Sequence, residues 1–104
     1  MYSSRIKSEE LDGLFRAILT LQSEEDCYRF FEDLCTIHEL QSMAQRMGVA
    51  AQLDEGLTYA AVAAITGASS ATISRVSRCL CYGADGYRRA LDRLKAEETG
   101  KEGQ

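Results

Sequence analysis

The stretch TGASSATISRVSRCL, residues 66–80, decides how the rest of the chain is interpreted. A glycine follows a helix-like run, a short polar cluster follows the glycine, and a second helical pattern with spaced apolar residues follows the cluster. An ordinary surface helix has no evident use for such a face of small polar side chains and arginines. In a helix that lies against a flat anionic surface, each of these small polar side chains and arginines has a function.

The composition predicts one all-α domain. The chain has 104 residues and no proline, and its few β-branched residues do not alternate with polar ones over any run. We expect a single domain over 1–104, with N-terminal helices in 8–56 for dimerisation, a helix-turn-helix in 57–82, a C-terminal helix in 85–97 and a frayed tail in 98–104. No apolar run is long enough for a signal peptide or a membrane span, so we expect a cytoplasmic protein with no membrane partner.

Capping residues mark where the helices begin. A hydroxyl residue precedes acidic residues at Ser8 and again at Ser23, and Thr36 followed by Glu39 has the spacing of a capping box. Later helices are expected to begin after Thr58 and near Ser69 or Ser70, and to end at glycines. This gives six helices joined by short loops.

The first helices carry more apolar surface than a small monomer can bury. Their aromatic and leucine side chains cover more than one face, and the adjacent Phe30 and Phe31 should diverge by about 100° around a helix. One explanation is a central helix buried on all sides. A homodimer in which these helices pack against a second copy fits a chain of 104 residues better.

The few residues with catalytic or metal-binding chemistry are not arranged for it. The four cysteines Cys27, Cys35, Cys79 and Cys81 include no C-x-x-C pair, so we expect reduced, small, buried hydrophobic side chains and no metal. His38 is the only histidine, and its neighbour Glu39 points off a different face of the helix. The sequence therefore predicts no enzyme and no cofactor.

Positive charge is concentrated where the opening stretch lies. The net charge is −4 over the chain, but residues 57–89 hold four arginines against one aspartate, while 1–56 carry five basic and eleven acidic groups. Distribution matters more than the sum for a nucleic-acid partner. The positive block coincides with the stretch quoted at the start.

Residues 59–78 have the pattern of a helix-turn-helix. Ala63 is small where two helices cross, Gly67 supplies the left-handed turn, and Ala68, Ile73 and Val76 point inward. Small hydroxyl and methyl groups then let the second helix approach base edges and phosphates in a DNA major groove. The residues predicted to contact DNA are Ser69, Ser70, Ala71, Thr72, Ser74, Arg75 and Arg78.

The run GASSATISRVSRCL resembles the recognition helix of the tryptophan repressor family, which carries a glycine-alanine turn and an A-T-I-[ST]-R core. Thr36, Glu39 and Arg46 match the same family's T-x-x-E and downstream arginine. The resemblance covers roughly residues 34–80 and is nearest to the short branch called YerC/YecD. It implies an all-α, six-helix, intertwined homodimer that regulates transcription, expected to be a repressor.

The resemblance also implies a pocket for a small-molecule co-regulator. Thr36, Arg46 and Arg75 match the threonine and two arginines that hold tryptophan in the repressor. Val76 stands where the repressor has a glycine that leaves room for the ring, and Cys79 stands where it has a serine. We therefore expect an effector other than tryptophan, or none.

Two departures leave an alternative function open. The basic residues of the repressor's first helix-turn-helix helix are alanines here, in AAVAAI, which predicts weaker DNA binding. Tyr59, Arg78, Arg88 and Arg89 are candidates to compensate. The alternative is a protein-interaction module that acts on the transcription machinery without binding specific DNA, with its acidic first half suited to a basic partner.

Overall fold

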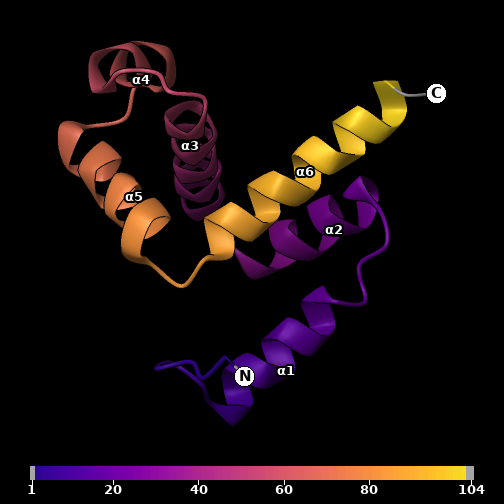
Figure 1. Cartoon of the computed structure of the whole chain (residues 1–104). Coiled ribbons are helices and arrows are strands. Elements are labelled where there is room, and N and C mark those ends of the chain that lie inside the picture. The colour runs from indigo at the N-terminus through magenta and orange to yellow at the C-terminus, as the bar shows by residue number, and fades with distance from the viewer. Residues whose placement is uncertain (1, 103–104) are drawn as a thin grey trace. The chain divides into compact units, whose positions relative to one another are not determined.

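The computed structural model describes residues 2–102 and is all-α within them (Figure 1). Six helices make up this part of the chain: α1 Glu9–Ile18, α2 Glu24–Leu34, α3 Ile37–Asp54, α4 Tyr59–Thr66, α5 Ser70–Tyr82 and α6 Gly86–Glu102. They group into two compact units, Met1–Ile37 and His38–Gln104. The all-α prediction with six helices is therefore confirmed.

Four helices begin at the hydroxyl residues that the sequence indicated. The caps Ser8, Ser23, Thr58 and Ser69 each accept a hydrogen bond, 3.1 Å long, from the backbone N–H three residues later. Each bond satisfies one of the N–H groups that a first helical turn leaves unpaired. Gly67 ends α4 in the left-handed region at φ 73°, as predicted.

The last helix is longer than the sequence predicted. It runs to Glu102, whereas we expected it to end near Glu97 and the following tail to fray. No proline follows Glu97, and glutamate and lysine are good helix formers, so only Gly100 opposes continuation. Residues 103–104 of the expected tail lie outside the described residues.

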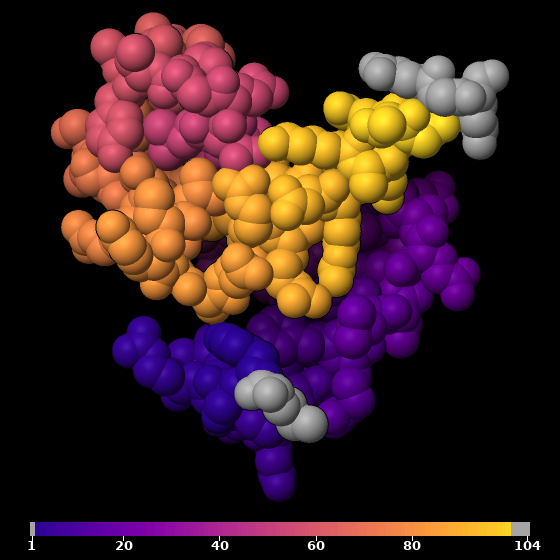
Figure 2. Space-filling view, viewed as in Figure 1, coloured from indigo at the N-terminus to yellow at the C-terminus, as the bar shows by residue number. Residues whose placement is uncertain are grey.

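The second unit has a continuous hydrophobic core at the junction of its four helices. Its buried members are Val49 and Ala50 of α3, Val62 of α4, Ala68 of the turn, Ile73 and Val76 of α5, and Leu91 of α6. α5 packs against both α4 and α6. In the space-filling view the atoms of α5 adjoin those of these two helices (Figure 2). This core fixes α5 from behind and leaves its other face exposed.

The first unit has no comparable core. None of its described residues is buried, and large apolar side chains remain exposed, among them Leu19 at 82% and Tyr28 at 69%. The rings of Phe30 and Phe31 contact each other edge to face, with centroids 5.3 Å apart.

The cysteines differ from the prediction in their burial. All four are free thiols, but Cys27, Cys79 and Cys81 are exposed and Cys35 is half-buried. The prediction of buried cysteines is therefore wrong. The helices place these positions on outward faces, which local sequence does not reveal.

Candidate nucleic-acid interface

The turn between α4 and α5 is held by its own backbone and by one side chain of α3. The Gly67 N–H donates to the Ala63 carbonyl at 2.9 Å, and the Ala68 N–H donates to Thr66 Oγ1 at 3.1 Å. The Thr66 hydroxyl in turn donates to the Val62 carbonyl at 2.7 Å. From α3, Gln45 Nε2 donates to the Thr66 carbonyl at 3.2 Å. These four hydrogen bonds hold the turn between α4 and α5.

Two hydroxyls at the start of α5 are bonded to each other. Ser69 Oγ accepts from the Thr72 N–H and donates to Thr72 Oγ1, both at 3.1 Å. Thr72 is also half-buried. Ser69 and Thr72 therefore have a structural role in addition to the contact with DNA that the sequence predicted.

The two faces of α5 differ as the sequence predicted. Ile73 and Val76 are each 1% exposed and belong to the core. Of the seven residues predicted to contact DNA, all but the half-buried Thr72 are exposed: Ser69, Ser70, Ala71, Ser74, Arg75 and Arg78. Because 70, 74 and 78 are spaced by four residues, two hydroxyls and a guanidinium follow one line along the helix. Such a surface can donate hydrogen bonds to an anionic partner and attract that partner by its positive charge.

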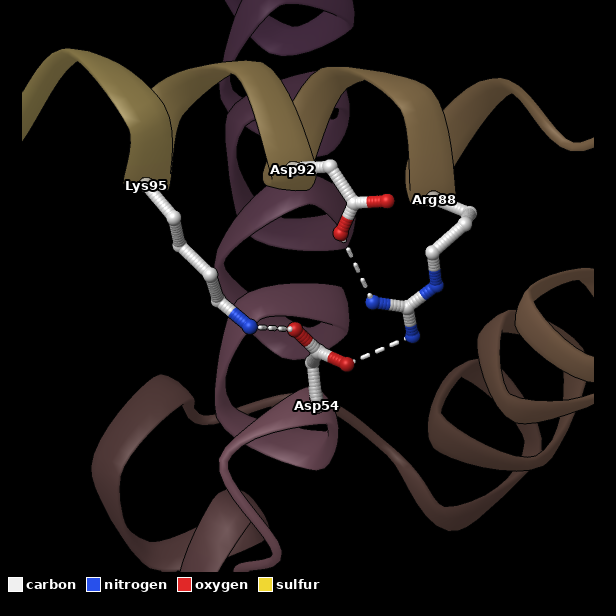
Figure 3. A network of polar contacts seen from close by, with 4 residues as sticks. All are labelled: Asp54, Arg88, Asp92 and Lys95. Atoms are coloured by element: carbon white, nitrogen blue, oxygen red, sulfur yellow. Dashed lines mark hydrogen bonds and ion pairs between the residues drawn. The ribbon is translucent and has the colours of Figure 1, made fainter.

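The arginines of the positive block are not equivalent. Arg75, Arg78 and Arg89 are exposed and make no ion pair with another described residue. Arg88 instead donates to Asp54 Oδ1 at 2.5 Å and to Asp92 Oδ1 at 3.3 Å (Figure 3). Arg88 is therefore not free to contact DNA, which removes it from the compensating residues that the sequence suggested.

Asp54, at the end of α3, is the centre of this polar network. Its other oxygen, Oδ2, accepts from Lys95 Nζ at 2.5 Å, and its side chain is only 9% exposed. Hydrogen bonds from Arg88 and then from Lys95 lower the pKa of Asp54 to about 2, against a desolvation effect that would raise it. The hydrogen bonds that Arg88 donates to Asp54 and then to Asp92 raise the pKa of Arg88. The network ties α6 to α3, and sequence analysis missed it because the partners lie 34 and 41 residues apart.

The residues predicted to form an effector pocket have unlike surroundings. Arg46 is half-buried on α3 and makes no hydrogen bond or ion pair with another described residue, so pairing with an acid on its own helix is not observed. Arg75 is exposed, whereas the adjacent Val76 lies in the core. Thr36 belongs to the first unit and is exposed.

Cys79, the last residue of that predicted pocket, lines an open depression. The other residues lining it are Ala84, Gly86 and Tyr87, from the loop before α6 and the first turn of that helix. The effector pocket as a whole stays a prediction.

The described part of the chain has neither a group of metal ligands nor a membrane-spanning helix. No three histidine, cysteine or acidic side chains there are grouped so that they could hold a metal ion. No helix within residues 2–102 combines the length and the apolar character needed to cross a membrane.

The chain is similar to known proteins in both sequence and fold. The family model described as Trp repressor protein matches residues 9–95. The YerC protein of Bacillus subtilis (strain 168) is 58% identical over 99 residues, which are 95% of each chain. The crystal structure of a candidate Trp repressor from Staphylococcus aureus superposes with a TM-score of 0.85 at 50% identity, covering 89% of this chain and 96% of that one. A TrpR-like protein from Eubacterium eligens ATCC 27750 gives 0.84 at 50% identity, with 88% and 94% covered.

Proposed function

We propose that this chain, which belongs to the Trp repressor family of regulatory DNA-binding proteins, is a sequence-specific transcriptional regulator. It acts as a repressor in this proposal. In this proposal α5 enters the major groove of duplex DNA. A homodimer presents two such helices to half-sites one helical turn apart, about 34 Å.

The exposed face of α5 is the observation that carries this proposal. Ala71 offers a methyl group suited to the thymine methyl, while Ser70 and Ser74 offer donors for base edges and phosphates. Arg75 and Arg78 have no ion-pair partner among the described residues, so pairing with DNA breaks no existing ion pair. The opposite face is occupied by the core, which leaves this face for a partner.

Electrostatics supports modest rather than tight binding. α4 has the sequence YAAVAAIT and carries no charge, and Arg88 is already paired with two acids. Each phosphate contact that is absent removes about one unit from the slope of log affinity against log salt. Specificity must then come mainly from base contacts and dimer geometry.

A substitution at Ala71 tests the proposal. A duplex is first selected from a random pool with the native protein, and its binding is measured by fluorescence anisotropy. Ala71→Glu places a carboxylate against the groove, so we expect binding to fall at least about 100-fold with the fold intact by circular dichroism. The matched control is Ala96→Glu, at an exposed alanine of α6, which should bind like the native protein. Equal binding by the native protein and the Ala71 variant would contradict the proposal.

We also propose that the family's effector pocket is not used for tryptophan here. Arg46 and Arg75 retain the chemistry to hold a carboxylate. Val76 is 1% exposed and packed among core side chains, so it leaves no free volume at its own position. A smaller co-regulator, or none, fits these residues better.

The alternative function, a protein-interaction module, has one observation in its favour. The uncharged α4 exposes Ile65 at 63% and Tyr59 at 47%, and apolar exposure of this kind is common at protein interfaces. Retention on random duplex DNA at low salt, lost by about 200 mM salt, favours DNA binding through counterion release. Absence of retention at low salt favours the protein partner.

A further inference from the structure

The side-chain amide of Gln45 reaches the turn of the helix-turn-helix from another helix. Gln45 lies in the middle of α3, and its Nε2 donates to the backbone carbonyl of Thr66 at 3.2 Å in a part-buried position. Thr66 is the last residue of α4, and the carbonyls of a last helical turn have no partner within their own helix. Gln45 therefore satisfies a group that would otherwise be left unpaired beside the core.

This bond differs in kind from the other bonds of the turn. Those bonds join residues of α4 and the turn to one another, as when the Ala68 N–H donates to Thr66 Oγ1. They fix the shape of the turn, whereas its place on the core is set by the packing of the buried Ala68. The Gln45 bond joins the turn to α3, a helix whose own residues Val49 and Ala50 are fully buried in the core. It therefore adds a directional restraint to the packing that places the turn on the unit.

The position of the bond determines what it controls. Ile73 and Val76 anchor the first half of α5 in the core by apolar packing, and the buried Ala68 anchors the turn that precedes its first residue, Ser70. Apolar packing is non-directional and tolerates small tilts, whereas a hydrogen bond to the turn just before α5 adds a directional restraint on its start. The exposed residues in that first turn include Ser70 and Ala71, which the proposed function assigns to base edges.

We propose that Gln45 is a positioning residue for DNA reading, which holds the first turn of α5 at the angle that the groove requires. The proposal rests on the proposed function. In this proposal Gln45 does not contact DNA. It acts by restricting the motion of Ser70 and Ala71, which do contact DNA. Such restriction strengthens binding because less freedom is lost when the complex forms.

The test replaces Gln45 by a side chain of similar length without a donor. Gln45→Met removes the bond with little change in volume, and Gln45→Glu removes the donor and places a carboxylate near the carbonyl. Gln41 lies one turn earlier on α3 and is exposed, so Gln41→Met and Gln41→Glu are matched controls for composition and charge. Anisotropy measures binding to the selected duplex and to random duplex, and hydrogen exchange measures protection of the Gly67 and Ala68 amides.

We expect Gln45→Met to weaken binding to the selected duplex about three- to tenfold, with binding to random duplex and the salt slope unchanged. The Gly67 and Ala68 amides should exchange faster, and Gln45→Glu should have the larger effect on both readouts. A role in stability alone would shift the unfolding midpoint and leave the ratio of selected to random binding unchanged, which would overturn the proposal.

The two proposals can fail separately. If the native protein selects no duplex, the proposed function fails, and the exchange measurement still reports on the bond. Unchanged exchange at both amides in Gln45→Met would overturn the positioning role whatever DNA binding shows.

Discussion

The two units of the chain differ in how many apolar residues they bury. In His38–Gln104, four helices enclose seven buried apolar residues, and ion pairs to the largely buried Asp54 carboxylate join two of the helices. In Met1–Ile37, two amphipathic helices bury no described residue. A helix is stabilised in a protein mostly by burial of its apolar face, so the two helices of the first unit gain little of this stabilisation within that unit.

This contrast leads to the largest expected effect, on assembly. We expect an obligate homodimer in which the first unit packs against a second copy, with no stable folded monomer. Phe15 of α1 and Leu19, the C-cap residue that follows this helix, are exposed at 48% and 82%. Replacing both by glutamate should weaken association by about 5 kcal/mol or more, because two apolar contacts are lost and two carboxylates are desolvated.

Sedimentation equilibrium over a range of concentrations measures this change. Arg16→Glu, at an exposed position of the same helix, is the control for added negative charge and should still assemble. A folded native monomer near 11.5 kDa at micromolar concentration would show that the first unit needs no second copy.

The next effect concerns the core of the second unit. Val76→Gly should lower the free energy of unfolding by about 3–5 kcal/mol, since it leaves a cavity and places a glycine inside a helix. Helix propensity by itself would account for only about 1 kcal/mol of this loss. The difference arises because Val76 is a core residue rather than the wall of an open pocket. Urea denaturation at fixed protein concentration measures it.

Calorimetry with L-tryptophan is a second test of whether Val76 is a core residue or the wall of a pocket. We expect no heat of binding with the native chain at millimolar ligand, and at most weak binding with the glycine variant. Clear binding by the native chain would mean that the pocket lies away from Val76, and the steric argument against tryptophan would fall.

The smallest effect concerns the polar network of the second unit. The pKa of Asp54 is lowered from 3.8 to about 2, so its contribution to stability is fully present above about pH 4 and is lost as the pH falls toward 2. Asp54→Asn should therefore destabilise the protein by on the order of 1–2 kcal/mol at neutral pH. The difference from the native chain should shrink between pH 4 and pH 2.

Denaturation at several pH values checks this dependence. Glu55→Gln, at the neighbouring exposed carboxylate, is the control and should change stability little at any pH. A difference for Asp54→Asn that stayed constant down to pH 2 would mean that the lost packing, not the lost charge, is what matters.

Local sequence was sufficient for the elements and for the turn. Ser8, Ser23, Thr58 and Ser69 begin helices because a hydroxyl can satisfy a nearby N–H whatever the rest of the chain does. Gly67 ends α4 because glycine adopts a positive φ at little cost. The spacing of Ile73 and Val76 likewise predicted which face of α5 is buried, and so which residues remain for a partner.

Tertiary structure decided which charges and polar groups are free. Arg88 and Arg89 are neighbours of the same type in the sequence, yet one is held by Asp54, 34 residues away, and the other is exposed. Gln45 and the exposed thiols Cys79 and Cys81 carry no local signal of their surroundings either. Backbone conformation depends on a few neighbouring residues, but side-chain pairing and burial depend on segments that only folding brings together. The sequence by itself therefore determined six helices and the outward face of α5, and the packing of α3, α5 and α6 determined which side chains on them can act.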